Sequence, residues 1–295
     1  MINLLASIPS PDTNTVDVGP FTIHMYGLML LLAIAAAVLL IGIRWRKLGG
    51  DWDLVLRMAV WGVAAGIVGA RAYHVITSWD EVPKEWWGVF AVWKGGLGVW
   101  GGILCGVLAG AVVVKRAGVS VFQMMDVAAP GLLLAQGIGR WGNYFNQELF
   151  GKPSDLPWAV QIDPQHRPSG YQLDSTFQPT FLYEFIWDVL MVGVLILVGW
   201  RYRIKAPALF ALYVSLYTAF RAYEETLRID PAHHFLGQRL NFWVSVVLFA
   251  IATAFFVWWQ FIRRGEGEER PARAPKQPPS GPAMAIPKGR VRPPR

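Results

Sequence analysis

The sequence predicts an all-α polytopic membrane protein. Of its 295 residues, 54% are apolar and only 16% are charged, and the mean hydropathy is positive. This composition lies outside the usual range of soluble globular domains. Apolar runs of the length that a helix needs to cross a bilayer core, about 20 residues, recur along the chain. We therefore expect seven transmembrane helices, a small cap on the outer face and a disordered cytoplasmic tail.

The seven expected spans follow one another with mostly short connections. Two of them contain polar interruptions: Asp126 and Gln136 lie in the fourth span, and Arg221 and Glu224 lie in the sixth. The cap is expected at about residues 140–180, where Pro, Gly, Asp and Gln are frequent. The expected spans are 23–43, 55–77, 96–114, 121–139, 181–200, 207–224 and 241–262.

The distribution of basic residues predicts the orientation. The short connections after the first, third and fifth spans carry Arg44, Arg46, Lys47 and Arg57, then Lys115 and Arg116, then Arg201, Arg203 and Lys205. Because cytoplasmic loops carry an excess of Lys and Arg, these connections are expected in the cytoplasm. The N-terminus is then outside and the C-terminus is cytoplasmic.

The net charge of +7 belongs to the end of the chain. Residues 263–295 contain nine Lys or Arg, three Glu and eight Pro. Residues 1–262 are therefore nearly neutral, which excludes a basic nucleic-acid-binding face on the membrane domain. With so few large apolar side chains, the segment 263–295 is predicted to be a disordered basic tail.

The cysteine and histidine content excludes several site types. The single cysteine, Cys105, cannot form an intramolecular disulfide and lies in an apolar run, where it is interpreted as a packing residue. No His, Cys or Asp cluster has the spacing of metal ligands. We expect neither a metal nor an organic cofactor.

A dense polar segment, "GRWGNYFNQE" at 139–148, directly follows an apolar run. Ionisable side chains at membrane depth are costly and mark functional sites. In a helix Arg140 and Asn143 share one face, and Gly139 and Gly142 allow a backbone or a lipid headgroup to approach. The alternative for Arg140 is a helix-end side chain that extends into the interface.

A second polar group lies in "TAFRAYEETLR", residues 218–228. Arg221, Glu225 and Arg228 repeat at spacings of four and three, which places them on one helix face. Arg221 is expected on the same side of the membrane as Arg140, and two guanidinium groups with nearby amides suit the phosphate of a lipid headgroup. A structural ladder of ion pairs is the alternative.

Further polar residues are expected near the same outer boundary. His24 and Tyr26 begin the first span, and Arg71 ends "VGAR" in the second. Glu184 and Asp188 share a face of the fifth span. An interfacial tyrosine anchor and a packed histidine are the alternatives for the first pair, but the positions permit one convergent site.

These motifs resemble those of a known family. "GRWGNYFNQE" is similar to the signature G-R-x-G-N-[FY]-x-N-x-E of bacterial prolipoprotein diacylglyceryl transferases and fits it at every fixed position. The resemblance extends over about residues 20–262. Further matches, in order, are His24, Tyr26 and Gly27, "VGAR", "GGLGVWGG", Gly151, "QPTFLYE", "AFRAYEE" and "GQ".

The resemblance implies an activity and its site residues. Members of this family transfer the diacylglyceryl group of phosphatidylglycerol to the thiol of the lipobox cysteine in a prolipoprotein signal peptide and release glycerol phosphate. It implies a bacterial cytoplasmic membrane protein without cofactor, which we expect to be a monomer. The implied catalytic residues are Arg140, Arg221, Tyr26, Asn143, Glu148 and His24, and the implied phosphatidylglycerol-binding residues are Arg140, Arg221, Asn143, Gly151, Glu225 and Arg71.

One position departs from the family pattern. Many members have a histidine in the glycine-rich segment, for which a role in deprotonating the thiol has been proposed, whereas this chain has Trp100. An indole cannot act as a base. His24 and Glu148 are the candidate replacements, and guanidinium groups beside the thiol would themselves favour the thiolate.

Two other classes of protein are alternatives to the enzyme. A transporter or lipid-translocating protein also places arginines and carboxylates inside a helix bundle, but it distributes polar groups through the depth of the membrane. A membrane scaffold with an interacting basic tail leaves the signature unexplained. The concentration of polar residues near one boundary favours the enzyme.

Overall fold

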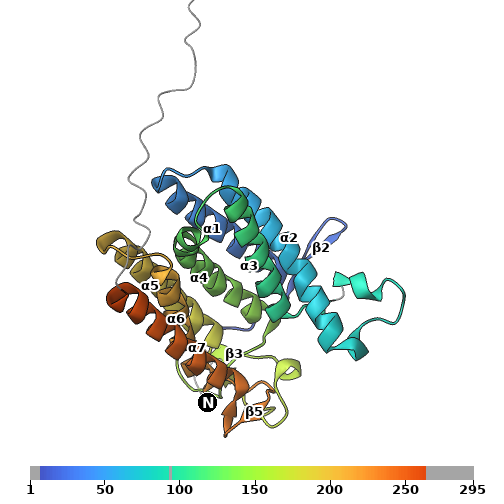
Figure 1. Cartoon of the computed structure of the whole chain (residues 1–295). Helices are drawn as coiled ribbons and strands as arrows, with labels where there is room; N and C mark the ends of the chain where they lie inside the picture. The colour runs from blue at the N-terminus through green and yellow to red at the C-terminus, as the bar shows by residue number, and fades with distance from the viewer. Residues whose placement is uncertain (1–6, 93–94, 264–295) are drawn as a thin grey trace, which may run out of the picture.

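The structure is a bundle of seven long helices with three short β-hairpins (Figure 1). It is a computed structural model and describes residues 7–92 and 95–263. The long helices are α1 (Met25–Lys47), α2 (Trp52–Thr77), α3 (Val99–Arg116), α4 (Val121–Asn146), α5 (Thr180–Arg201), α6 (Ala208–Glu225) and α7 (Leu240–Val257), the last continued by a π-helical turn, Trp258–Ile262.

Local chemistry sets several helix ends. Asp51 caps α2 by accepting a hydrogen bond from the Asp53 backbone N–H at 3.2 Å, and Ser120 does the same for α4 with Gln123 at 3.4 Å. Arginines and lysines occupy the last turns of α1 and α3, where they complement the negative end of the helix dipole. α4 ends at Asn146, and the capping residue Gln147 that follows has a left-handed backbone with φ +51°.

Six of the helices, α1 to α5 and α7, are long and apolar enough to cross a membrane. α6 is not among them, because Arg221, Glu224 and Glu225 lie in its last two turns. The expected helical, polytopic membrane architecture is therefore confirmed, and all seven expected spans coincide with helices.

Three two-stranded antiparallel hairpins accompany the helices. β1 (Thr15–Val18) and β2 (Phe21–His24) precede α1. β3 (Val160–Gln161) and β4 (Thr176–Phe177) lie in the segment between α4 and α5. β5 (His234–Phe235) and β6 (Gln238–Arg239) connect α6 to α7. A cluster of Phe150, Val160, Ile162, Phe177 and Phe181 forms the apolar core of the segment between α4 and α5.

α4 is the central helix of the bundle and contacts α1, α5 and α6. Ala128 on one side packs in a cluster with α1, α2 and α3 residues, and Ala129 and Leu133 pack in another with α5 and α6. α2 and α3 form a close pair, since a Cβ on Gly101 would lie 2.3 Å from the Gly69 carbonyl oxygen. The candidate site residues of α4 are thereby placed in the middle of the bundle.

Two of the boundaries that differ from the prediction concern candidate site residues. The fourth helix does not end at residue 139 but continues to Asn146, so Arg140 and Asn143 belong to the helix and not to the cap. The apolar run on which the span was predicted stops at residue 139, whereas the helix continues through the polar residues that follow, as the shared helical face of Arg140 and Asn143 requires. The first helix begins at Met25, and His24 ends β2. The predicted disordered tail lies outside the described residues except for Arg263.

Candidate active site

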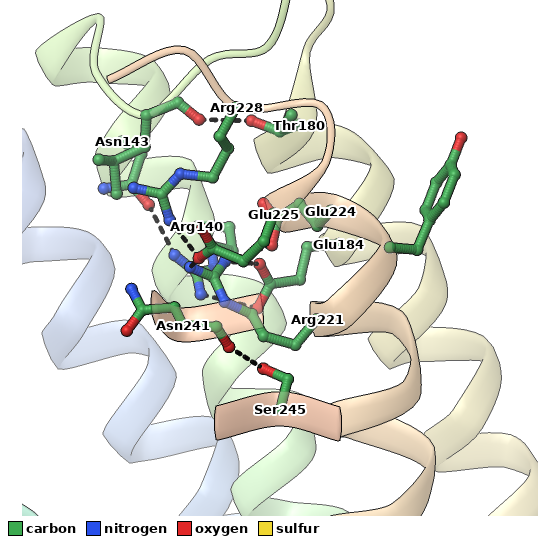
Figure 2. A network of polar contacts seen from close by, with 12 residues as sticks. Arg140, Asn143, Thr180, Glu184, Arg221, Glu224, Glu225, Arg228, Asn241 and Ser245 are labelled. Atoms are coloured by element: carbon green, nitrogen blue, oxygen red, sulfur yellow. Dashed lines mark hydrogen bonds and ion pairs between the residues drawn. The ribbon is translucent and has the colours of Figure 1, made fainter. Parts of the chain in front are cut away.

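The site is built around a buried carboxylate that two arginines share. Glu184 of α5 is fully buried. Arg140 Nη2, from α4, lies 2.8 Å from its Oε1, and Arg221 Nη1, from α6, lies 3.5 Å from its Oε2. Figure 2 shows the three side chains pointing toward one another from three helices. The two arginines expected to form a phosphate clamp are thus brought together.

Two further carboxylates hold Arg221. Its Nη1 pairs with Glu224 and its Nη2 with Glu225, both from the next turn of α6 (Figure 2). Both glutamates are buried. The guanidinium of Arg221 is therefore fixed on both its Nη atoms before any ligand binds, which is the preorganisation that electrostatic catalysis requires.

Glu225 connects Arg221 to the hairpin that follows α6. Its Oε1 also lies 3.4 Å from Arg228 Nη1, and its Oε2 accepts a hydrogen bond from Arg239 Nε of β6 at 2.5 Å. Arg221 and Glu225 lie on one face of α6 as predicted, but the prediction was wrong for Arg228, because α6 ends at Glu225 and Arg228 reaches Glu225 from the segment after the helix. Arg239, which is buried, is an additional member that the sequence analysis did not identify.

Asp230 completes this network outside the helices. It accepts hydrogen bonds from Arg228 at 2.8 and 2.9 Å and from Arg239 Nη2 at 2.8 Å. Burial disfavours its charged form, but the hydrogen bonds and charges of Arg228 and Arg239 outweigh burial and hold the pKa of Asp230 below its usual value. Asp230 is therefore a carboxylate at neutral pH and fixes both arginines.

A chain of amide contacts leads from Arg140 toward the surface. Arg140 Nη1 donates to Asn143 Oδ1 at 3.4 Å, and Asn143 Nδ2 donates to Glu148 Oε1 at 2.8 Å. Asn143 is buried and Glu148 is exposed. The predicted common face of Arg140 and Asn143 is confirmed. Glu148 is connected to Arg140 through the side chain of Asn143.

The ring of Tyr26, from α1, packs against α4 at Gly142. A Cβ on Gly142 would lie 2.7 Å from Tyr26 Cδ2, so only glycine at this position lets the ring lie against the helix. Tyr26 is still 42% exposed. His24 ends the hairpin just before α1 and is exposed, whereas Trp100, at the start of α3, is 56% exposed.

Gly151 belongs to the support of the site. Its N–H donates to the Gln178 carbonyl at 2.9 Å, and it forms a β-bridge with Arg228. A Cβ there would lie 3.0 Å from Gln178 Cβ and 3.2 Å from the Leu227 carbonyl oxygen. Gly151 therefore keeps the segment after α4 close to the arginine network.

Arg71 has a different environment from the other predicted site residues. Its guanidinium donates to four backbone carbonyls of the connection between α2 and α3: Val89 at 2.9 Å, Gly95 at 2.9 Å, Gly96 at 3.0 Å and Gly88 at 2.5 Å. In the structure it fastens this connection to the end of α2. Within the described part of the chain, no hydrogen bond or ion pair joins Arg71 to Glu184, Arg140 or Arg221.

Asp188 lies one turn from Glu184 on the same face of α5, as the spacing predicts. It is fully buried, and neither carboxylate oxygen has a hydrogen-bond partner within residues 7–92 and 95–263. The absence of a side chain at Gly137 makes room for it, since a Cβ there would lie 3.0 Å from Asp188 Cβ.

This arrangement suits an anionic ligand. Arg140 keeps 20% of its side chain accessible while Glu184 has none, so the arginine is held from the buried side and part of its side chain remains exposed. Guanidinium groups bind phosphate oxygens in pairs of charge-assisted hydrogen bonds. No group of three or more His, Cys, Asp or Glu side chains within the described ranges could hold a metal ion.

The residues that the sequence analysis missed are Glu224, Asp230 and Arg239. Glu224 directly precedes Glu225 but reaches Arg221 at a spacing of three, a signal that the helical periodicity contained. Asp230 precedes the hairpin of β5 and β6 and Arg239 is the last residue of that hairpin, and no periodic pattern links them to Glu225. Other polar residues, His233, His234 and Gln238, lie between them, so their charge did not single them out.

Comparison with known proteins places these residues in a family. Residues 13–258 match the family model described as Prolipoprotein diacylglyceryl transferase. Proteins named phosphatidylglycerol–prolipoprotein diacylglyceryl transferase are similar to the chain: one from Frankia alni is 46% identical over 83% of this chain, one from Paenarthrobacter aurescens 44% over 85% and one from Cutibacterium acnes 43% over 89%.

The extent of the match differs among these relatives. The aligned part covers 65% of the Frankia alni protein, slightly less than two thirds, but 82% and 90% of the other two. Nearly all of the helical bundle is included in the family match. The chain is an integral membrane protein and belongs to the prolipoprotein diacylglyceryl transferase family.

Proposed function

We propose that this protein transfers the diacylglyceryl group of phosphatidylglycerol to the thiol of a lipobox cysteine, forming a thioether and releasing glycerol phosphate. This is the first step of bacterial lipoprotein maturation. The relatives' names support the activity. The observation that carries the proposal is the shared carboxylate of Glu184, which holds Arg140 and Arg221 side by side.

The chemistry explains why two arginines are needed. The cysteine sulfur attacks the glyceryl carbon, a C–S bond forms, and the C–O bond to phosphate breaks with its electron pair leaving on oxygen. The phosphodiester, with one negative charge, becomes a phosphate monoester with nearly two. Arg140 and Arg221 are assigned to this phosphate, because fixed cations stabilise charge that develops in a site from which water is excluded.

The thiol proton needs an acceptor, and Glu148 is the better placed of the two candidates. It is exposed and hydrogen-bonded to Asn143, which contacts Arg140. His24 lies on a separate hairpin without a contact to this chain of residues among those described. Glu148 would take the proton from sulfur as attack begins, and Tyr26 and Asn143 would position the headgroup.

Gly151, Glu225 and Arg71 have supporting roles in the proposed mechanism. Gly151 and Glu225 act through the arginine network, which they hold in place. Arg71 would contribute by shaping the connection between α2 and α3 beside the lipid and not by binding the phosphate directly, since its guanidinium donates hydrogen bonds to that connection.

The proposed topology has seven spans, with α6 as the sixth. The basic ends of α1, α3 and α5 support a cytoplasmic position for these ends, so that the N-terminus, the active site and the cap between α4 and α5 face outward and residues 263–295 form a cytoplasmic tail. The location is the bacterial cytoplasmic membrane. The partners are phosphatidylglycerol and prolipoprotein signal peptides, with no nucleic acid, and the protein acts as a monomer.

The test is a direct assay. The purified full chain is incubated with phosphatidylglycerol and a lipobox peptide, and release of glycerol phosphate is followed. We expect release that depends on the peptide thiol and stops with a Cys→Ser peptide. Deletion of residues 266–295 should leave the rate unchanged. Failure to release glycerol phosphate by a protein that unfolds cooperatively and binds phosphatidylglycerol would contradict the proposed activity.

A further inference from the structure

The hairpin of β1 and β2 has one entirely apolar face. Val16 pairs with Ile23 and Val18 pairs with Phe21, and because directly opposed residues point to the same side of a sheet, these four side chains share one face. All four are exposed, by 48, 40, 55 and 71% respectively. Figure 1 shows the ribbon of β2 projecting beyond the helices.

The opposite face is polar. Thr15 pairs with His24 and Asp17 pairs with Thr22. The Thr22 hydroxyl donates to Asp17 Oδ1 at 2.7 Å across the two strands. The alternation is therefore complete over the whole hairpin, and the register that produces it is fixed by a two-residue turn in which Gly19 has φ +61° and Pro20 follows.

This hairpin would be unstable with both faces in water. An isolated two-stranded hairpin is marginally stable at best and requires a partner for its apolar face. In the described residues the sheet has only these two strands, and its four apolar residues remain exposed. Something outside the described structure must therefore cover them.

The position of the hairpin relative to α1 identifies the partner. Strand β2 ends at His24 and α1 begins at Met25, whose N–H donates to the Asn14 carbonyl at 2.8 Å and ties both strands to the helix start. In the proposed topology Arg44, in the last turn of α1, lies at one boundary of the bilayer. At 1.5 Å per residue the start of α1 lies about 29 Å away, which is close to the opposite boundary of a core of about 30 Å.

The geometry points to a membrane-docked hairpin: we infer that Val16, Val18, Phe21 and Ile23 insert into the lipid surface at the level where α1 begins, while Thr15, Asp17, Thr22 and His24 face water. The first turns of α1, a few residues further along the chain, also carry exposed apolar side chains, among them Leu30, Leu31 and Leu32. The occupant of this face is the phospholipid bilayer.

Adjacent residues of the hairpin point to opposite faces, so each variant on the apolar face has a neighbouring variant on the polar face as its control. In a Cys105→Ala background, single substitutions Val18→Cys and Phe21→Cys label the apolar face, and Asp17→Cys and Thr22→Cys label the polar face. A nitroxide is attached to each in vesicles of phosphatidylethanolamine and phosphatidylglycerol. Collisions with oxygen, which concentrates in lipid, are compared with collisions with a water-soluble nickel chelate.

We expect nitroxides at 18 and 21 to be several-fold more accessible to oxygen than to nickel, and those at 17 and 22 to show the reverse. Equal nickel accessibility at all four positions would overturn the inference, because the hairpin would then stand in water. Exclusion of both reagents at 18 and 21 would also overturn it and would mean that protein covers this face. Val16→Cys and Ile23→Cys provide a second apolar pair should a first variant fail to fold.

Discussion

Arg140 and Arg221 lie on different helices and share one carboxylate, Glu184, at 2.8 and 3.5 Å. Two cations that would otherwise repel each other are thereby held in one place before the lipid arrives. The buried position of Glu184 strengthens the effect, because charges interact more strongly where water is excluded. The proposed stabilisation of the leaving phosphate depends on this spatial relationship of the two arginines.

Glu184→Gln is expected to abolish most of the activity without preventing folding. Removal of the shared charge leaves two cations close together and displaces at least one of them, with an expected loss on the order of 10²-fold in kcat. Removal of one partner of a buried ion pair costs about 3–5 kcal/mol, so the melting temperature should also fall. Asp53→Asn, which breaks the exposed pair with Arg57, is the control and should change neither. Wild-type kcat in Glu184→Gln would rule out the shared carboxylate as the organiser of the site.

Arg140→Lys separates charge from geometry. Lysine keeps the positive charge but lacks the planar fork that binds two oxygens at once, so we expect glycerol phosphate release to be reduced but measurable, and Arg140→Ala to be the more inactive of the two. The assay is the rate at saturating phosphatidylglycerol. Arg57→Lys serves as the control at an exposed position. Equal rates for Arg140→Ala and the wild type would eliminate the clamp.

Gly139 and Gly142 lie three residues apart in the signature, and the space beside Gly139 is open whereas the space beside Gly142 is filled. A methyl group at Gly142 would lie 2.7 Å from the Tyr26 ring, whereas one at Gly139 would meet no atom within 4 Å. Gly→Ala favours a helix by up to about 1 kcal/mol, and overpacking costs about 1–3 kcal/mol. Gly139→Ala should therefore raise the melting temperature slightly, and Gly142→Ala should lower it and reduce turnover by displacing Tyr26. Identical melting temperatures would show that the ring does not lie against α4.

Arg239→Gln tests a positioning residue. Arg239 does not contact Arg140 or Arg221, but it holds Glu225, which holds Arg221. We expect kcat to fall with little change in the KM for the peptide, because the phosphate clamp is disturbed and the peptide site is not. Arg239→Lys, which restores the charge, should recover part of the rate. A loss of stability at unchanged kcat would indicate a purely structural role.

The lowered pKa of Asp230 predicts an acid-sensitive component of stability. A carboxyl group whose pKa is lower in the folded state stabilises the protein above its unfolded pKa, about 3.9, and this stabilisation is lost as the pH falls through the folded value. Between pH 8 and 5 the contribution should be constant, and it should decline below about pH 4. Melting temperatures of the wild type and Asp230→Asn, measured in detergent from pH 7 to 3, should converge toward the acid end. A constant difference over that range would contradict the prediction.

The helical part of the fold could be predicted because lipid imposes length and composition. Each predicted span coincides with a helix, and the spacing of Arg140 and Asn143 and of Arg221 and Glu225 placed each pair on one face. The end of α4 was placed too early because the apolar run stops at residue 139, although the helix continues through the polar residues that follow. Local helical patterns therefore gave the members of the site but not the boundary of their helix.

Contacts between distant segments could not be read from the sequence. Arg239 meets Glu225 only because the hairpin of β5 and β6 folds back on α6. Similarly, the sequence placed Arg71 near the outer boundary, but its partners depend on a connection in which Gly95 and Gly96 have positive φ angles of 84° and 71°. Such turns are set by tertiary structure and by glycine, not by a repeating pattern.

The attachment of the connection between α2 and α3 to Arg71 has a consequence for which substitutions the connection tolerates. The partners of the guanidinium are backbone carbonyls, which every residue type supplies. The attachment therefore depends on the path of the backbone and not on the side chains of the connection. Substitutions that preserve this backbone path should leave the connection attached to the end of α2.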